Sequence, residues 1–294
     1  MRGPRGGPAA ARQLEISPAV ASAALKRLES ELEVRLFARS TRSLRLTPEG
    51  DAFLLHARAS LRSLEEGRRL LQGGKDQIAG VLQLSAPSDF GRNLLLPWLD
   101  EFQARYPQLS LRLLLGDRVT DLYRQPVDVA IRYGAPADSS LVALPLAPDN
   151  RRVLCAAPGY LAERGEPRQP DDLREHNCLL YQLGGRVHDR WAFQRGRRSL
   201  TLTVAGDRVC DDADVVRRWA LAGKGLVYKS WLDVAEDVRA GRLRLLLPEW
   251  QGEATPMNLL CTHRAQLTRP VTLLRAFVRE RCDALLAEAP WTRN

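Results

Sequence analysis

Small and basic side chains share one face of a predicted helix that follows Ser17-Pro18. The Ser17 hydroxyl suits an N-cap, and Pro18 has the backbone angle of a first helical position, so both favour a helix start here. The residues of the outer face are Ala19, Ser22, Ala23 and Lys26. A slim face without negative charge can enter the major groove of duplex DNA, where Ala19 and Ala23 are able to touch thymine methyl groups. We therefore predict that Ser17, Pro18 and this face contact DNA.

Arginines follow this helix with no carboxylate between them. They are Arg35, Arg39, Arg42 and Arg45. The segment is short enough for a β-hairpin with a polar tip at 40–43. We expect Arg39 and Arg42 to bind DNA phosphates or to enter the minor groove. Each feature also has an ordinary interpretation, because Ser-Pro begins many helices and exposed arginines often form a solvated face. Their combination favours a DNA-binding module.

The charge of the chain is concentrated near this helix. The 294 residues carry a formal net charge of +9, and residues 1–75 hold 14 Lys and Arg against 8 Asp and Glu. A quarter of the chain thus carries two thirds of the excess, as a phosphate-binding module requires. With 45% hydrophobic residues, the remaining chain is long enough for one or two further folded domains.

Several protein classes do not fit the composition. The N-terminus lacks the apolar segment of a secretory signal, and no stretch of about 18 residues is free of charge, so neither secretion nor a membrane span is expected. The five cysteines, at 155, 178, 210, 261 and 282, include no Cys-x-x-Cys pair, which is typical of reduced thiols. We expect a cytoplasmic protein with no metal and no cofactor.

Helical elements are predicted on both sides of the hairpin. A short helix over 9–15 leads to the helix after Ser17, in which Val20, Ala24, Leu25, Leu28 and Leu32 form an apolar stripe. Thr47-Pro48 begins a second helix over about 48–73. Its apolar residues, interrupted at Arg68, are Leu54, Ala57, Leu61, Leu64 and Leu71. This spacing favours a coiled-coil dimer seam over packing within the helix's own domain.

From residue 80 onward, strands alternate with helices. Strands are expected at 81–85, 109–115, 127–131, 151–156, 190–194, 198–204 and 225–229. Helices are expected at 94–106, 118–124, 158–163, 212–222 and 270–287. This order predicts an α/β architecture with largely parallel sheets, arranged as two lobes with a cleft between them. In such sheets, ligands settle at the carboxyl ends of strands.

The order and spacing of several segments are similar to the LysR-type transcriptional regulators. They are residues 16–29, 36–42, 46–50, 128–134, 222–227 and 240–243. The resemblance implies a winged helix-turn-helix, a long linker helix and a two-lobed effector domain like that of periplasmic binding proteins. It also implies a regulator that binds double-stranded promoter DNA, responds to a small-molecule effector and assembles as a homodimer or homotetramer.

The resemblance assigns boundaries to these parts. The DNA-binding domain would span 1–47, the linker helix 48–76 and the effector domain 80–294. Within the last, lobe I would comprise about 80–150 and 255–294, and lobe II about 151–254. Family members begin with an additional helix, whereas here MRGPRGGP precedes the matching AAARQL and is too rich in Gly and Pro for a helix. We therefore expect a DNA-binding domain truncated at its N-terminus, either because the true start lies upstream or because the helix is missing.

Six polar residues are candidates for the effector site. They are Ser85, Ser88, Asp89, Arg132, Asp212 and Lys229. Most of them lie at strand ends or at helix starts, where donors converge, and Arg132 suits a carboxylate, so an organic acid is the candidate effector. Alternatively, Ser88 and Asp89 only cap the next helix, and Arg132 pairs with a neighbouring Asp.

Two other functions compete with a regulator. An enzyme is not expected, because no nucleophile elbow, His-Glu-x-x-His or P-loop is present. The four histidines, at 56, 176, 188 and 263, stand apart from one another. The alternative is a stand-alone ligand sensor of the solute-binding type without competent DNA binding, which the basic first quarter of the chain opposes.

Overall fold

The computed structural model describes residues 16–39, 44–72, 78–117, 127–134, 140–183 and 185–292. The chain divides into two units, Met1–Lys75 and Asp76–Asn294. The helices expected over 9–15 and 118–124 lie outside the described residues. No helix among the described residues is both long and apolar enough to cross a membrane.

The first unit begins its described part with the expected helix, α2 (Pro18–Glu31). Ser17 is its N-cap, and the Ser17 Oγ accepts a hydrogen bond from the Val20 amide at 3.2 Å, which confirms the predicted start. After the helix, a carboxylate oxygen of Glu29 accepts the amides of Leu36 and Phe37 at 2.8 and 3.0 Å. This contact ties α2 to the strand that follows.

The hairpin and the second helix of this unit are also present. Strands β1 (Phe37–Arg39) and β2 (Leu44–Leu46) pair antiparallel, with Phe37 opposite Leu46. Helix α3 (Pro48–Gln72) starts as predicted, because the Thr47 Oγ1 accepts the Gly50 amide at 2.9 Å. A Cβ at Gly50 would lie 2.0 Å from the Leu36 carbonyl oxygen, so only glycine allows this close approach.

The apolar stripe of α2 has a different environment from the one its spacing predicts. No residue of α2 is buried. Val20 is 55% exposed and Leu32 is 37% exposed, whereas Leu28 is half-buried. Among the described residues, therefore, this stripe is covered only in part.

The second unit contains two separate main sheets, and we call the parts built around them lobe I and lobe II. The lobe I sheet has the order β4-β3-β5-β16-β6. Its strands are β3 (Gly80–Ala86), β4 (Leu109–Leu115), β5 (Val129–Tyr133), β6 (Val142–Ala147) and β16 (Met257–Cys261). Strands β4, β3 and β5 are parallel, whereas β16 runs antiparallel to both of its neighbours. Four of the five strands thus run in the same direction, and only β16, which enters the sheet after lobe II, is reversed.

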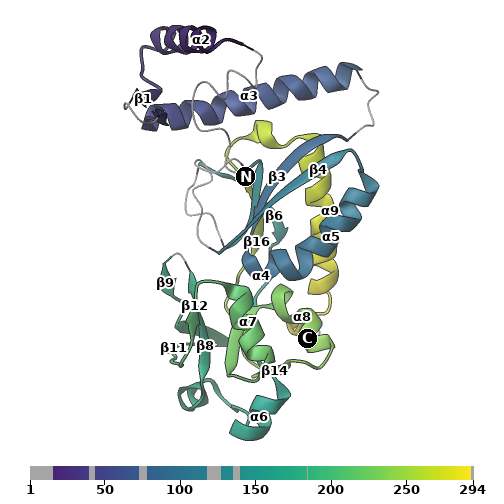
Figure 1. The fold of residues 1–294 in the computed structure, drawn as a ribbon. Coiled ribbons are helices and arrows are strands. Elements are labelled where there is room, and N and C mark those ends of the chain that lie inside the picture. Colours follow the sequence, from purple (N-terminus) through teal and green to yellow (C-terminus); the bar gives the residue numbers. More distant parts are fainter. Residues whose placement is uncertain are drawn as a thin grey trace. The chain divides into compact units, whose positions relative to one another are not determined.

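Helical segments cover the lobe I sheet. They are α4 (Ser88–Phe90), the π-helical turn η1 (Gly91–Leu95), α5 (Leu96–Arg105), the 3-10 turn η3 (Arg264–Gln266), α9 (Arg269–Leu286) and the 3-10 turn η4 (Pro290–Thr292). The first three follow one another without a break. The first therefore starts six residues before the Leu94 expected from sequence. Figure 1 shows α5 and α9 together beside this sheet.

Lobe II is built on a second mixed sheet and a smaller antiparallel one. The larger sheet has the order β12-β8-β13-β7-β14, and the smaller has the order β11-β10-β15. The strands are β7 (Arg152–Ala156), β8 (Cys178–Leu183), β9 (Arg186–Val187), β10 (Arg190–Arg195), β11 (Arg198–Thr203), β12 (Val209–Cys210), β13 (Leu226–Ser230), β14 (Arg244–Leu246) and β15 (Gln251–Gly252). The helices are α6 (Pro158–Arg164), the 3-10 turn η2 (Pro170–Glu175), α7 (Ala213–Leu221) and α8 (Trp231–Arg239).

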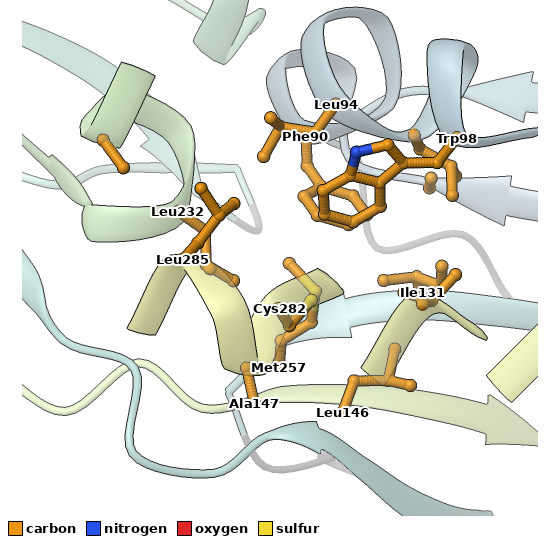
Figure 2. Close-up of a cluster of buried hydrophobic side chains, with 14 of the residues drawn as sticks. Phe90, Leu94, Trp98, Ile131, Leu146, Ala147, Leu232, Met257, Cys282 and Leu285 are labelled. Carbon is orange, nitrogen blue, oxygen red and sulfur yellow. The ribbon is translucent and has the colours of Figure 1, made fainter. Parts of the chain in front are cut away.

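One hydrophobic core continues from lobe I into lobe II. Figure 2 shows Phe90, Leu94 and Trp98 facing strand residues of lobe I, with Leu232 of α8 and Leu285 of α9 in the same cluster. The Trp231 indole donates to the Leu285 carbonyl at 2.9 Å. The two lobes therefore share packed apolar side chains as well as polar contacts.

Candidate DNA interface and effector site

The predicted DNA-contacting face of α2 is open to solvent. Its four residues are Ala19, Ser22, Ala23 and Lys26, and each is exposed. The same holds for Ser17 and Pro18 at the start of the helix. Their spacing of three and four residues places the four on one side of the helix.

The hairpin of β1 and β2, which would be the wing of the DNA-binding domain, is described only in part. Arg39 ends β1, but its side chain lies outside the described residues, as does Arg42 in the segment 40–43. Arg35 and Arg45 are described and exposed. The described part of the hairpin therefore presents two guanidinium groups to solvent.

The proposed dimer seam of α3 exposes leucines. Leu61 is 61% exposed and Leu64 is 66% exposed, whereas Leu54 and Ala57 are half-buried. The Leu71 side chain lies outside the described residues. Two large apolar side chains one helical turn apart thus face solvent within this unit.

In lobe I, Arg132 and Ser85 come together at the carboxyl ends of β5 and β3. The Arg132 guanidinium donates to the Ser85 Oγ and to the Ile131 carbonyl, both at 2.7 Å. Burial lowers the pKa of Arg132, and the Asp117 carboxylate acts in the opposite direction. The described hydrogen-bond acceptors of Arg132 are thus a hydroxyl and a backbone carbonyl. It is a half-buried cation that suits an anionic ligand.

Ser88 contacts a carboxylate that sequence reasoning missed. The Ser88 amide donates to Asp117 Oδ1 at 2.8 Å, and the Ser88 hydroxyl donates to Asp117 Oδ2. The Ala213 amide of lobe II donates to Asp117 Oδ2 at 2.7 Å and to the Ser88 Oγ at 3.1 Å. Neither Ser88 nor Asp89 caps the helix, since Pro87 holds the N-cap position. Asp117 lies two residues after the end of β4, so the rule that ligands lie at strand ends would have found it.

Asp212 is the N-cap of α7 and connects the two lobes. Its Oδ1 accepts the amides of Asp214 and Val215 at 3.0 and 3.4 Å. Arg92 of lobe I donates to both Asp212 oxygens at 2.8 and 2.9 Å. Burial raises the pKa of Asp212, but the Arg92 hydrogen bond and charge outweigh burial and hold the pKa below its usual value.

Asp89 and Lys229 form a buried ion pair between the lobes. The Lys229 ammonium contacts Asp89 Oδ2, lies 3.5 Å from Asp233 Oδ2 and donates to the Ala213 carbonyl at 3.1 Å. Burial lowers the pKa of Lys229, but the two carboxylates outweigh it and raise the pKa above the usual lysine value. Tyr133 of lobe I donates to Asp233 at 2.6 Å.

The six candidates therefore fall into three groups. Ser85 lies with Arg132, Asp89 lies with Lys229, and Ser88 lies close to the α7 helix that Asp212 caps. The partners absent from the sequence prediction are Arg92, Asp117, Tyr133 and Asp233, together with Asn93, whose amide donates to Asp89 Oδ1 at 2.7 Å. Among the described residues, no group of three or more His, Cys, Asp or Glu has the arrangement of a metal site.

Comparison with known proteins identifies both parts of the chain. Residues 75–283 match the family described as LysR substrate binding domain, and residues 8–51 match the family described as bacterial regulatory helix-turn-helix protein, lysR family. The chain is 32% identical over 259 residues to the HTH-type transcriptional regulator DmlR of Escherichia coli (strain K12), covering 88% of the chain and 83% of DmlR. It is 33% identical over 271 residues to the HTH-type transcriptional activator AaeR of the same strain, covering 90% and 85%.

A solved structure supports the same relationship. CrgA, a LysR-type transcriptional regulator from Neisseria meningitidis, aligns with a TM-score of 0.62 at 29% sequence identity. The alignment covers 94% of this chain and 93% of CrgA. The likeness therefore includes the helix-turn-helix part as well as the two lobes.

Proposed function

The chain belongs to the LysR family of bacterial transcriptional regulators, and from this premise we propose which of its residues bind DNA, effector and partner. It is a DNA-binding regulator with an effector-binding domain, not an enzyme. We propose that residues up to 47 form the DNA-binding domain, 48–76 the linker helix and 80–294 the effector domain. Lobe I would take about 80–150 and 255–294, and lobe II about 151–254. The regulator would act in the cytoplasm, where the chromosome lies.

The DNA contacts follow from the open face of α2. Ser22 and Ala23 add little bulk to this face, and Lys26 adds a positive charge. A face of this kind fits the major groove, while Arg39 and Arg42 of the wing would reach the flanking backbone. The test is a gel-shift titration of the full chain with the DNA just upstream of its own coding region. Retention at low ionic strength that declines as salt rises supports the proposal. Failure to shift that fragment at low ionic strength contradicts it.

The effector is an organic acid that Arg132 binds. The observation that carries this proposal is the half-buried guanidinium whose described partners are a hydroxyl and a backbone carbonyl. A carboxylate would form two parallel hydrogen bonds with such a group. A thermal-shift screen of small organic acids on the full chain tests this, repeated on Arg132→Ala. An acid that stabilises the wild type and has no effect on the variant supports the role of Arg132. Equal stabilisation of both proteins removes it from the site.

The same chain would assemble as at least a dimer through α3. Leu61 and Leu64 continue the spacing of Leu54 and Ala57, and they are exposed within their own unit. If they packed against the same residues of a second copy of the chain, Leu61 and Leu64 would bury this apolar surface. The mass of the particle in solution distinguishes a dimer from a tetramer made of two such dimers.

A further inference from the structure

Asp117 joins the two lobes through one carboxylate group. Both of its oxygens are occupied: Oδ1 accepts the Ser88 amide at 2.8 Å, and Oδ2 accepts the Ser88 hydroxyl and the Ala213 amide. The Ser88 donors belong to lobe I, and Ala213 is the first residue of α7 in lobe II. Ser88 is 1% exposed and Asp117 is half-buried, so these hydrogen bonds are partly shielded from water.

The N-terminus of α7 lies against this carboxylate. The first turn of α7 directs three amides towards its N-terminus: Asp117 accepts the first, and Asp212 accepts the next two at 3.0 and 3.4 Å. The partial positive charge at a helix N-terminus stabilises anions. The Asp117 carboxylate also adds to the raising of the Arg92 pKa, which is due mainly to Asp212, and it opposes the lowering of the Arg132 pKa by burial. Two guanidinium groups therefore interact with its charge.

A free carboxylate would present the same two oxygens to the same donors. We propose that Asp117 is an internal ligand that occupies a carboxylate site between the lobes, and that an acidic effector competes with it for the Ser88 and Ala213 donors. The inference rests on the proposed function, because it takes the effector to be an organic acid bound beside Arg132. It adds an autoinhibitory contact: the protein holds its own carboxylate where the effector's would bind, and binding must break the contact that Asp117 makes across the lobes.

Chemical rescue tests this in the full chain. Asp117→Ala removes the carboxylate and leaves room for a free one. The variant is expected to unfold about 3–8 °C below the wild type, because three charge-assisted hydrogen bonds are lost. Acetate should recover at least half of this shift, and sodium chloride at equal ionic strength should recover none. Asp100→Ala, at an exposed position of α5, is the matched control. If acetate stabilises Asp117→Ala no more than it stabilises the wild type and the control, the proposal is wrong.

A second measurement covers the case in which Asp117→Ala does not fold. Asp117→Asn keeps the shape of the side chain but places an amide against the donors. The Ala213 amide should exchange its hydrogen at least tenfold faster in this variant than in the wild type, whereas the Val227 amide in β13 should not change. Equal exchange at Ala213 in both proteins contradicts the role of Asp117.

The outcome is separable from the proposed function. Acetate rescue is measured without DNA, and operator retention is measured without acetate. Rescue with no operator retention leaves the carboxylate site intact and contradicts the proposed DNA contacts. Operator retention without acetate rescue supports the proposed DNA contacts and contradicts the carboxylate site.

Discussion

Lys229 of lobe II makes a buried ion pair with Asp89 of lobe I, with exposed fractions of only 2% and 1%. A buried charge that loses its partner is strongly destabilising, because the remaining ion stays out of water. Lys229→Met leaves Asp89 and Asp233 facing each other without the ammonium between them. We expect the free energy of unfolding to fall by about 3–5 kcal/mol in urea titrations. Arg244→Met, which removes an exposed ion pair with Glu166, should cost far less. Equal losses in the two variants would contradict the importance of burial.

The Arg92–Asp212 pair gives the effector domain an acid-sensitive contact. The pKa of folded Asp212 lies below its usual value, so the pair stabilises the fold above the ordinary aspartate range. This contribution disappears as the pH falls through the lowered pKa. Thermal midpoints of Asp212→Asn should therefore lie below those of the wild type at neutral pH, and the two curves should converge as the pH falls below the ordinary aspartate range. A difference that widens on acidification would contradict the assignment.

Lys26 should contribute to DNA affinity through phosphate charge. If its ammonium neutralises one phosphate, Lys26→Ala lowers affinity on every sequence and reduces the slope of log K against log salt by about one. The matched control is Lys224→Ala, which removes an exposed lysine from lobe II. The slopes come from fluorescence anisotropy with an operator fragment at several salt concentrations. An unchanged slope in Lys26→Ala would remove this residue from the interface.

The exposed leucines of α3 should govern the oligomeric state. Leu61→Asp places a charge in the proposed seam, where the partner helix would have to bury it. We expect the particle mass from sedimentation equilibrium to fall to that of a smaller assembly at micromolar concentration. Ser60→Asp, one residue away and also exposed, should keep the wild-type mass. If both variants behave like the wild type, α3 is not the interface.

Gly50 and Gly67 of α3 should respond in opposite directions to alanine. A Cβ at Gly50 would lie 2.0 Å from the Leu36 carbonyl oxygen, whereas a Cβ at Gly67 meets no atom within 4 Å. Gly50→Ala should destabilise the first unit by about 1–3 kcal/mol through overpacking. Gly67→Ala should stabilise it by about 0.5–1 kcal/mol, since alanine favours helix. Circular dichroism during thermal unfolding distinguishes the two variants. A lower stability of Gly67→Ala would show that open space around the added Cβ is not enough to make the substitution stabilising.

Helix starts in this chain are visible in local sequence. Ser17-Pro18 and Thr47-Pro48 each combine a capping hydroxyl with a proline, and α2 and α3 begin there. Strands β8 and β16 were missed, because short apolar runs such as those from Cys178 and Met257 have no period that separates strand from helix. Helix α8 was missed because it follows β13 at Ser230-Trp231 without an intervening loop.

The candidate site was predictable one residue at a time but not in its pairings. Ser85 and Arg132 lie at strand ends, which is a local property. That Asp89 meets Lys229, or that Asp117 meets Ala213, depends on how two lobes pack, since the partners are 140 and 96 positions apart in the sequence. No sequence pattern within either segment predicts these pairings. The mixed sheet has the same origin, since strand direction is decided where the chain returns from lobe II.

Strand β16 inserts between β5 and β6 after the whole of lobe II has been traversed. On the ribosome, β5 and β6 emerge long before the strand that pairs with both of them exists, and β5 lacks one of its two ladders until Cys261 has been made. The sheets of lobe II need no later strand, because their strands all lie between Arg152 and Gly252. The middle of the chain can therefore acquire its structure first during synthesis, and the flanking segments close around it last.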